Sequence, residues 1–194
     1  MKTLIILANP RRDSFNHAIS ESVKESLLEL GHEIYFHDLY LERFDPVLSA
    51  DEISAEESDL PPELRRYIDE VRESQGLIFI HPNWWGGAPA ILRGWIDRVF
   101  RQNSIYNFTP NGVVSSIGDK VVQIFSTSNT PRDIELNVYG NPVEIFWKTI
   151  VFGLLGSKSF ERINFESIIM STNEQRKEWL KETKKIIKRR FSEN

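Results

Sequence analysis

Stretches with the pattern of buried strands alternate with stretches of helical spacing, and this alternation constrains the fold more than any other feature. The strand-like stretches are residues 3–8, 33–38, 76–81, 120–126 and 158–169. The helical stretches are residues 14–30, 62–74, 88–100, 142–155 and 174–191. Strands that alternate with helices through short connections form a parallel sheet with helices on both faces. The sequence therefore predicts an α/β fold, doubly wound, as a single domain over residues 1–194.

Three connections are expected to lack regular structure. Residues 39–62 hold a run of acidic side chains and are interpreted as a solvated surface excursion, because charge runs usually form a solvated face. Residues 102–118 are expected to be irregular, and residues 129–140 are expected to form a loop.

The composition is that of a globular domain, with 40% hydrophobic and 27% charged residues. The net charge of −4 argues against a general binder of nucleic acid or anionic membranes. The absence of cysteine excludes disulfides, cysteine-ligated metals and a thiol nucleophile. The four histidines show no metal-ligand spacing, so no metal site is expected, and without a G-x-S-x-G motif a serine hydrolase is not predicted.

Neither the N-terminus nor the longest uncharged stretch predicts a membrane segment. Residues 3–8 are too short for the apolar region of a signal peptide and lack a cleavage site, so a cytoplasmic protein is expected. Residues 74–92 carry no Asp, Glu, Lys or Arg, but their glycines and prolines exclude a spanning helix.

Three loops should carry the chemistry. In an open parallel sheet, ligands bind beyond the carboxyl ends of the strands, where the strand order reverses. The loops that follow three of the predicted strands there are residues 9–16, 82–88 and 126–133. We expect them to meet.

The first loop runs into the start of a helix, where free backbone N–H groups and the helix dipole favour an anion. Ser14 and Asn16 add side-chain donors, and Arg11 and Arg12 add positive charge. The alternative is that Asp13 or Ser14 only caps the helix. The loop has neither a G-x-G-x-x-G nor a P-loop motif.

The second loop contains two adjacent tryptophans, Trp84 and Trp85, followed by Gly86 and Gly87. Two neighbouring side chains at a strand end cannot both enter the core. Large aromatic groups beside glycines suit a planar ligand. The alternative is that the tryptophans cover the end of the sheet or a subunit contact.

The sequence around these loops resembles the flavodoxin-like NAD(P)H:quinone oxidoreductases. That family includes DT-diaphorase, the modulator-of-drug-activity flavoproteins and the ancillary subunits of glutathione-gated potassium efflux systems. The resemblance rests on Ser14-Phe15-Asn16 and on the stretch from Pro82 to Phe100, including Pro-Ala-Ile-Leu-Arg-Gly-Trp-Ile-Asp-Arg-Val. It implies a flavodoxin-like five-stranded parallel sheet.

The resemblance also implies site residues. The flavin phosphate would be held by Ser14, Phe15 and Asn16. The flavin ring would be lined by Pro82, Asn83, Trp84, Trp85, Ser126, Thr127, Ser128 and Asn129, the last four matching the family's Thr-Thr-Gly-Gly loop. Trp85, Gly86 and Tyr106 would shape the pocket for the electron acceptor, while Trp84 would mainly support the flavin.

The sequence departs from the family pattern at three places. Asn9 stands where the family has a histidine near the phosphate. Ser128 and Asn129 replace two glycines, and Asp133 replaces a tyrosine. Tyr139 stands where the family keeps a histidine, so it is the candidate catalytic residue as a hydrogen-bond donor to reduced flavin, or else a packed surface tyrosine.

The function implied is a flavin-dependent NAD(P)H oxidoreductase that reduces quinones or similar acceptors by a ping-pong, two-electron reaction. FMN is expected, FAD is the alternative, and NAD(P)H is the hydride donor. Two other functions stay open: a flavodoxin-type electron carrier, and a flavin-binding regulatory subunit of a potassium efflux system. A homodimer is expected, because residues 102–118 are rich in apolar side chains and the matching family segment, with an aromatic at Tyr106, closes the partner's pocket.

Overall fold

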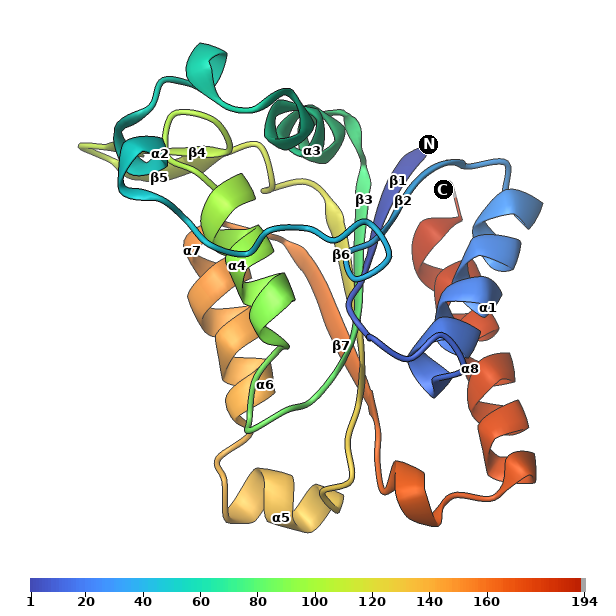
Figure 1. The fold of residues 1–194 in the computed structure, drawn as a ribbon. Coiled ribbons are helices and arrows are strands. Elements are labelled where there is room, and N and C mark those ends of the chain that lie inside the picture. The colour runs from blue at the N-terminus through green and yellow to red at the C-terminus, as the bar shows by residue number, and fades with distance from the viewer. Residues whose placement is uncertain (193–194) are drawn as a thin grey trace.

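The fold is built on one five-stranded parallel sheet, seen in a computed structural model that describes residues 1–192. The strands are β1 (Lys2–Leu7), β2 (Glu33–Asp38), β3 (Gly76–Pro82), β6 (Val121–Thr127) and β7 (Ser159–Phe165). Their order in space is β2-β1-β3-β6-β7, and every neighbouring pair is parallel. This order reverses direction between β1 and β3, which is the flavodoxin-like arrangement (Figure 1). The predicted fold class is confirmed.

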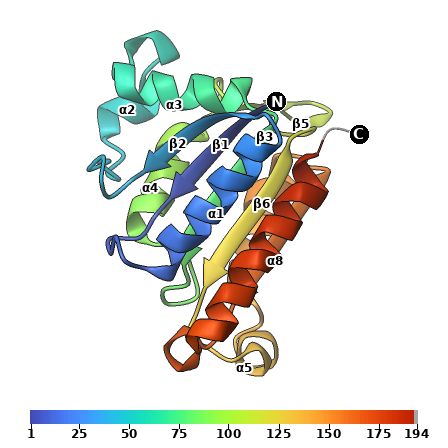
Figure 2. The ribbon, with the colours of Figure 1, turned by 90° about the vertical axis from the view of Figure 1, so that its right-hand side faces the viewer.

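Helices cover both faces of this sheet. One face carries α1 (Phe15–Glu29) and α8 (Asn173–Phe191), which lie side by side in Figure 2. The other carries α3 (Pro62–Glu73), α4 (Ala90–Val99) and a helical stretch formed by α6 (Pro142–Glu144), the π-helical η2 (Ile145–Val151) and α7 (Phe152–Leu154).

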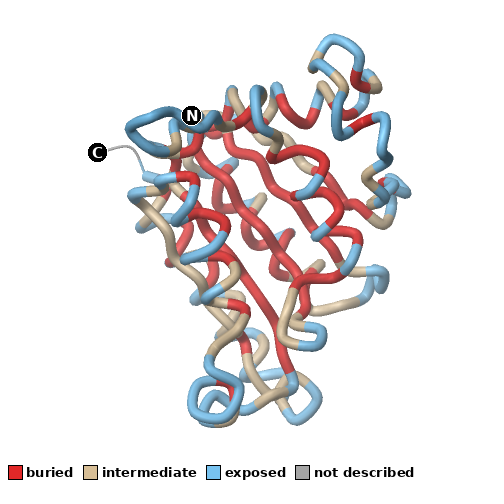
Figure 3. The backbone as a smooth tube through the Cα atoms, turned by 90° about the vertical axis from the view of Figure 1, so that its left-hand side faces the viewer, coloured by how far each residue is buried: buried red, intermediate tan, exposed pale blue. Residues whose placement is uncertain are grey.

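Each face has its own hydrophobic core, because strands in a parallel sheet are buried on both sides. Alternate β1 residues divide between the cores, with Leu4 and Ile6 in one and Ile5 and Leu7 in the other. The three central strands, β1, β3 and β6, are buried along nearly their whole length, as the red tube in Figure 3 shows. A rigid central sheet of this kind fixes the ends of the strands, and therefore the loops that follow them.

Two segments predicted to lack structure contain regular elements. Within residues 102–118, β4 (Tyr106–Thr109) and β5 (Gly112–Ser115) pair as an antiparallel hairpin, so the prediction of an irregular segment is wrong. Within residues 129–140, α5 (Arg132–Asn137) begins after Pro131, so the predicted loop is partly helical. The helix begins with the Pro131 carbonyl, which accepts from the Glu135 N–H at 3.0 Å, a local contact that the loop-like composition did not reveal.

The long connection 39–62 is not simply a solvated excursion. It contains α2 (Ala50–Ser54) and a short 3₁₀ turn, η1 (Glu57–Asp59). Glu52 is 8% exposed and forms an ion pair with the Arg98 guanidinium of α4 at 2.8 Å. This buried ion pair holds the connection in contact with α4.

The last strand is shorter than predicted, since β7 ends at Phe165 and a 3₁₀ turn, η3 (Ile168–Met170), follows. Within residues 1–192, no helix is both long enough and apolar enough to cross a membrane.

Candidate functional site

The three predicted loops meet at the carboxyl end of β6, and their junction is Thr127. The backbone N–H of Asn83, after β3, donates to the Thr127 carbonyl at 2.7 Å. The Thr127 hydroxyl donates to Asn16 Oδ1, at the start of α1, at 3.2 Å. The expectation that the loops come together is therefore confirmed.

The side chain of Asn16 is oriented by its neighbours. Asn9 Oδ1 accepts from the Arg11 backbone N–H at 2.9 Å, so its Nδ2 group is the one that donates to Asn16 Oδ1, at 2.8 Å. With the Thr127 hydroxyl also donating to that oxygen, the Asn16 Nδ2 group must face the other way. Asn16 is 2% exposed, yet this Nδ2 group has no hydrogen-bond partner within residues 1–192. Buried donors are rarely left unsatisfied, so the group points to an absent acceptor.

The beginning of α1 places further donors at the same position. Ser14 is the N-cap, with extended backbone, and its hydroxyl accepts from the His17 N–H. No acidic residue lies in the first turn. Phe15 packs its ring against Phe165 and Trp179, at centroid separations of 5.7 and 5.8 Å, so only its backbone remains for a ligand. An unpaired amide beside a helix N-terminus suits an anion such as a phosphate.

A chain of three hydrogen-bonding side chains, Ser14, His17 and Asp38, begins at the N-cap. Ser14 Oγ is 2.9 Å from His17 Nδ1, and His17 Nε2 is 3.1 Å from Asp38 Oδ2. Asp38 ends β2, the strand next to β1, and is 6% exposed. Helix α1 and strand β2 thus bring a histidine and a carboxylate to the anion site.

The tryptophan loop is a tight turn. Trp84 and Gly87 exchange two backbone hydrogen bonds of 2.9 and 3.0 Å. Trp85 and Gly86 both have positive φ, 54° and 74°, as a type I′ turn requires. This conformation is uncommon for a tryptophan, and it leaves the Trp85 side chain fully exposed, whereas Trp84 is 43% exposed. An exposed aromatic ring held at a strained backbone position is a feature typical of a binding site.

A cleft of about 560 Å³ opens beside this turn. Its lining comes from the loops after β3 and β6 and from the segment around α5: Asn83, Trp85, Gly86, Thr130, Glu135, Tyr139 and Pro142. The Asn83 Oδ1 atom is buried and lacks a partner in the described part of the chain. The cleft therefore joins an exposed indole, an exposed phenol and an unsatisfied amide oxygen, which suits a flat ligand with polar edges.

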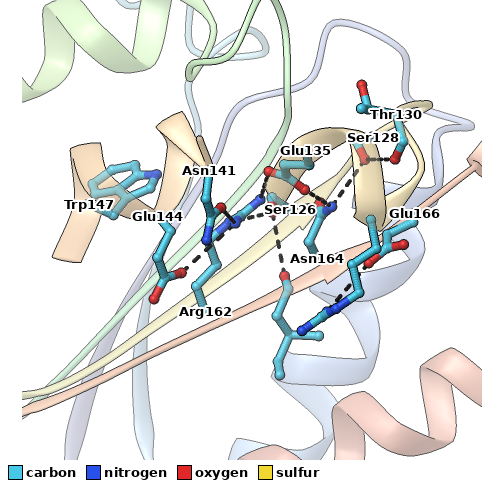
Figure 4. Close-up of polar contacts among 12 residues, drawn as sticks. Ser126, Ser128, Thr130, Glu135, Asn141, Glu144, Trp147, Arg162, Asn164 and Glu166 are labelled. Atoms are coloured by element: carbon cyan, nitrogen blue, oxygen red, sulfur yellow. Dashed lines mark hydrogen bonds and ion pairs between the residues drawn. The ribbon is translucent and has the colours of Figure 1, made fainter. Parts of the chain in front are cut away.

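A buried polar network supports the floor of the cleft (Figure 4). Arg162 of β7 donates to Glu135 at 2.8 Å and to the Ser126 hydroxyl at 3.0 Å. Asn164 donates to the other oxygen of Glu135 at 2.8 Å and to the Ser128 hydroxyl at 3.0 Å. Ser126 and Ser128 are buried, and their hydroxyls form hydrogen bonds within the protein. A ligand could therefore contact only the backbone of these two residues.

His81 and Trp147 form a second buried pair beneath the tryptophan loop. The Trp147 indole N–H donates to His81 Nε2 at 2.9 Å, so His81 Nδ1 carries the proton and donates to the Pro82 carbonyl at 2.8 Å. Complete burial lowers the pKa of His81 to about 4, and the positive charge of Arg162 acts in the same direction. His81 is thus a neutral structural group that fixes the end of β3.

Of the other predicted site residues, Asn129 and Tyr139 lie near the cleft and Tyr106 does not. Asn129 and Tyr139 lie on the exposed side of the site, with Asn129 Oδ1 accepting from the Ile169 N–H at 3.1 Å. Tyr106 is on β4, beyond the far end of α4 from the Trp84–Gly87 turn. Within one chain it does not line the cleft with Trp85 and Gly86.

The sequence placed Asn9 near the phosphate, but His17, Asp38, Glu135 and Arg162 were not predicted as parts of the site. Two signals were available. His17 follows Ser14 by three residues on a helix, which places the two side chains on one face. Asp38 stands at the carboxyl end of a strand, where ligand-binding loops begin. Arg162 and Glu135 gave no such signal, because their contact depends on how β7 pairs with β6.

Comparison with known proteins agrees with this architecture. A family model described as "Flavodoxin-like fold" matches residues 1–189. An uncharacterized NAD(P)H oxidoreductase of Haemophilus influenzae is 30% identical over 170 residues, covering 86% of this chain and 82% of that protein. NAD(P)H dehydrogenase [quinone] 1 of Cavia porcellus is 35% identical over 125 residues, which is 55% of this chain and 46% of that enzyme. The match to the Cavia porcellus enzyme thus spans less than half of its length.

Solved structures give the same picture. The NAD(P)H:quinone oxidoreductase of Methanothermobacter marburgensis is 25% identical, with a TM-score of 0.81 over 96% of this chain and 97% of that chain. An FMN-dependent NADH-azoreductase of Bacillus anthracis, solved in complex with FMN, has a TM-score of 0.82 over 99% of each chain but is 16% identical, so it shows a shared fold alone.

The chain therefore belongs to the flavodoxin-like family. Its sequence relatives lie among the NAD(P)H:quinone oxidoreductases of that family, as the resemblance in its loops implied.

Proposed function

We propose that this protein is an FMN-dependent oxidoreductase that takes a hydride from NAD(P)H and passes two electrons to a quinone or a similar acceptor. The observation that carries the proposal is the pair of unsatisfied buried amide atoms, Asn16 Nδ2 and Asn83 Oδ1, on two loops that meet at Thr127. One is a donor at a helix N-terminus and the other an acceptor beside an aromatic cleft. A phosphate tail and a planar ring with polar edges satisfy both.

The residues present fit such a cofactor. Ser14, Asn16 and the backbone of Phe15 would hold the phosphate. Asn83, Trp84, Trp85 and the backbone of residues 126–129 would line the ring, with Pro82 closing the end of β3. A bound flavin supplies the two-electron chemistry, accepting a hydride from NAD(P)H and giving it to the acceptor.

The chain's own part is to position the reactants and to manage protons. Trp85 and Gly86 leave one wall of the cleft aromatic and the other free of side-chain bulk, so a flat acceptor can lie there. The Tyr139 hydroxyl is the candidate donor to the reduced ring. Productive transfer needs the reacting atoms about 3–3.5 Å apart, which the rigid turn at Trp84–Gly87 helps to secure.

We also propose a homodimer, in which Tyr106 of one protomer closes the cleft of the other. Three observations support this: Tyr106 lies far from the cleft of its own chain, the indole of Trp85 has no cover, and the hairpin exposes Phe108 and Val114. A cytoplasmic location is part of the same proposal.

Variants of the two tryptophans test the site. Replacement of Trp85 by alanine should leave flavin content unchanged but raise the KM for quinone or alter the preferred acceptor. Replacement of Trp84 by alanine should lower flavin retention. Both variants are compared for flavin per chain and for steady-state kinetics with a small and a large quinone. If Trp85→Ala loses flavin while its kinetics per bound flavin are unchanged, the two roles are reversed.

A further inference from the structure

We propose that Arg162 is a positioning residue for the acceptor cleft, because its guanidinium holds both ends of the segment 136–140 and so fixes Tyr139. The proposal rests on the proposed function, since the acceptor would lie in the cleft that Tyr139 lines. Arg162 itself does not line the cleft, so it would act only through this segment.

The part of the chain that carries Tyr139 has little apolar anchorage of its own. Of residues 131–140, all of which the structure describes, Glu135 is the only buried one. The apolar side chains of Leu136 and Val138 are 40% and 66% exposed, and Tyr139 is 60% exposed. Because burial of apolar side chains is what usually holds a segment against a domain, this one depends on polar contacts.

Arg162 of β7 supplies these contacts at both ends of the segment (Figure 4). Its Nη2 donates to Glu135 Oε1 at 2.8 Å, just before the segment, and its Nη1 donates to Asn141 Oδ1 at 3.1 Å, just after it. Its Nε donates to the Ser126 hydroxyl of β6 at 3.0 Å, which ties the same guanidinium to the sheet. The side chains of Arg162 and Glu135 are each 5% exposed, so water competes little for these hydrogen bonds.

The backbone between the two anchors turns back on itself. The Asn141 N–H donates to the Glu135 carbonyl at 2.7 Å, and the Tyr139 N–H donates to the Ile134 carbonyl at 3.0 Å. Gly140 and Asn141 both have positive φ, of 72° and 55°, a conformation that glycine and asparagine tolerate better than most residues. Tyr139 stands two residues before the second anchor, so a displacement of that anchor also displaces its phenol.

Replacement of Arg162 by lysine separates geometry from charge. An ammonium group keeps the positive charge beside Glu135, but it lacks the planar fork with which arginine donates to three partners at once. In Arg162→Lys, the backbone amides of residues 136–141 should exchange with deuterium about tenfold faster than in the wild type, because a hydrogen bond to a charged group is lost. Amides of β1 and β3 should exchange at the wild-type rate, since the sheet stays folded.

Steady-state kinetics of the flavin-loaded protein give the second readout. The kcat/KM for quinone should fall about tenfold in Arg162→Lys, because a small displacement of the cleft wall weakens productive positioning of the acceptor. Flavin per chain should not change, because β6, which leads into the ring-lining residues, is held by its pairing with β3 and β7.

Two further positions supply the controls. Glu144 Oε2 lies 3.9 Å from Arg162 Nη1, so Glu144→Gln removes a carboxylate beside the same guanidinium without removing either anchor, and it should behave as the wild type. Asn141→Gly tolerates the positive φ but removes one anchor at a partly exposed position, so it gives the same test if Arg162→Lys does not fold. Asn141→Asp keeps an acceptor for Arg162 and should restore slow exchange and wild-type kinetics.

The proposal is overturned if residues 136–141 exchange no faster in Arg162→Lys and Asn141→Gly than in Glu144→Gln and Asn141→Asp, or if faster exchange leaves kcat/KM unchanged. Faster exchange that extends to β1 and β3 would also overturn it, because it would show a general loss of stability. A wild-type protein that reduces no quinone would instead contradict the proposed function, and the exchange rates would still show whether Arg162 holds the segment.

Discussion

At the scale of single residues, the cofactor site depends on the orientation of one amide. Ser14 and Asn16 were predicted as phosphate ligands from a helix start and a family motif, and both lie at that position. That Asn9 orients Asn16 could not be predicted from the sequence, because the hydrogen bonds of Asn9 depend on how the loop after β1 folds back. The replacement of the family's histidine by Asn9 thus has a structural consequence that a motif comparison does not reveal.

This orientation leads to a first prediction. Asn16→Asp keeps the acceptor for Asn9 and Thr127 but replaces the unpaired NH₂ donor with a carboxylate oxygen. FMN binding should weaken by at least about 2 kcal/mol, because a hydrogen bond to a charged phosphate is lost and a like charge is added. Fluorescence titration measures the change. Riboflavin binding, which lacks the phosphate contact, is the control, and equal weakening of both ligands would contradict the assignment.

His81 gives a second prediction at this scale. Its pKa is about 4 in the folded chain and about 6.5 when exposed, because burial disfavours the charged ring. The neutral ring therefore stabilises the fold fully above about pH 6.5, and this stability is lost as the pH falls toward about 4.

The loss between about pH 7 and about pH 5 should be about 2 kcal/mol. His81→Gln can still accept from Trp147 and donate to Pro82 but does not titrate. Urea unfolding of both proteins at the two pH values measures the difference between them. A variant whose stability falls with pH as steeply as the wild type's would show that His81 is not the group responsible.

At the scale of elements, the sequence predicted the five strands and the long helices because their apolar periodicities are strong and local. It failed for residues 39–62 and 102–118, where structure comes from distant partners. The buried Glu52 lies in an acidic run and looks solvated until Arg98 of α4 is placed against it. Apolar and polar residues alternate only weakly along β4 and β5. From the sequence, this hairpin therefore could not be distinguished from an irregular loop.

A close contact between α4 and the connection after β2 explains why residue 94, in the stretch that resembles the family, is a glycine. An ideal Cβ on Gly94 would lie 2.1 Å from the Pro46 carbonyl oxygen, so α4 and the connection after β2 can touch only because this side chain is missing. We predict that Gly94→Ala destabilises the fold by about 2–3 kcal/mol through overpacking. Urea unfolding gives the value, with Asp97→Ala on the exposed side of α4 as the control. Stability within about 0.5 kcal/mol of wild type would mean that the connection moves away at little cost.

At the scale of the whole molecule, the proposal is that a second copy of the chain covers the cleft. Trp85 is fully exposed. The β4–β5 hairpin, which carries the exposed Phe108 and Val114, lies at the other end of the domain from α5 (Figure 1). The order of the strands could be predicted from the alternation of strands and helices and from the topology of the resembled family. The contact surface of the proposed dimer could not be predicted, since it would depend on side chains that are exposed in a single chain.

We therefore predict a dimer in sedimentation velocity at micromolar concentration. Tyr106→Ala should leave the flavin content of each chain unchanged but raise the KM for quinone, because only the cover of the partner's cleft is lost. Asn107→Ala, at an exposed position on the same strand, is the matched comparison for a purely structural effect. A monomer that turns over quinone as fast as the wild type would contradict the shared site.

The measurement that tests the central claim most directly is a two-step anaerobic reaction of the purified protein. The account predicts one flavin per chain, whose visible absorbance is bleached by NADH or NADPH and restored when a quinone is added. A protein that lacks a flavin and does not take up FMN would contradict the account. So would a flavin that NAD(P)H leaves oxidised, because the protein would then be a carrier rather than an NAD(P)H oxidoreductase.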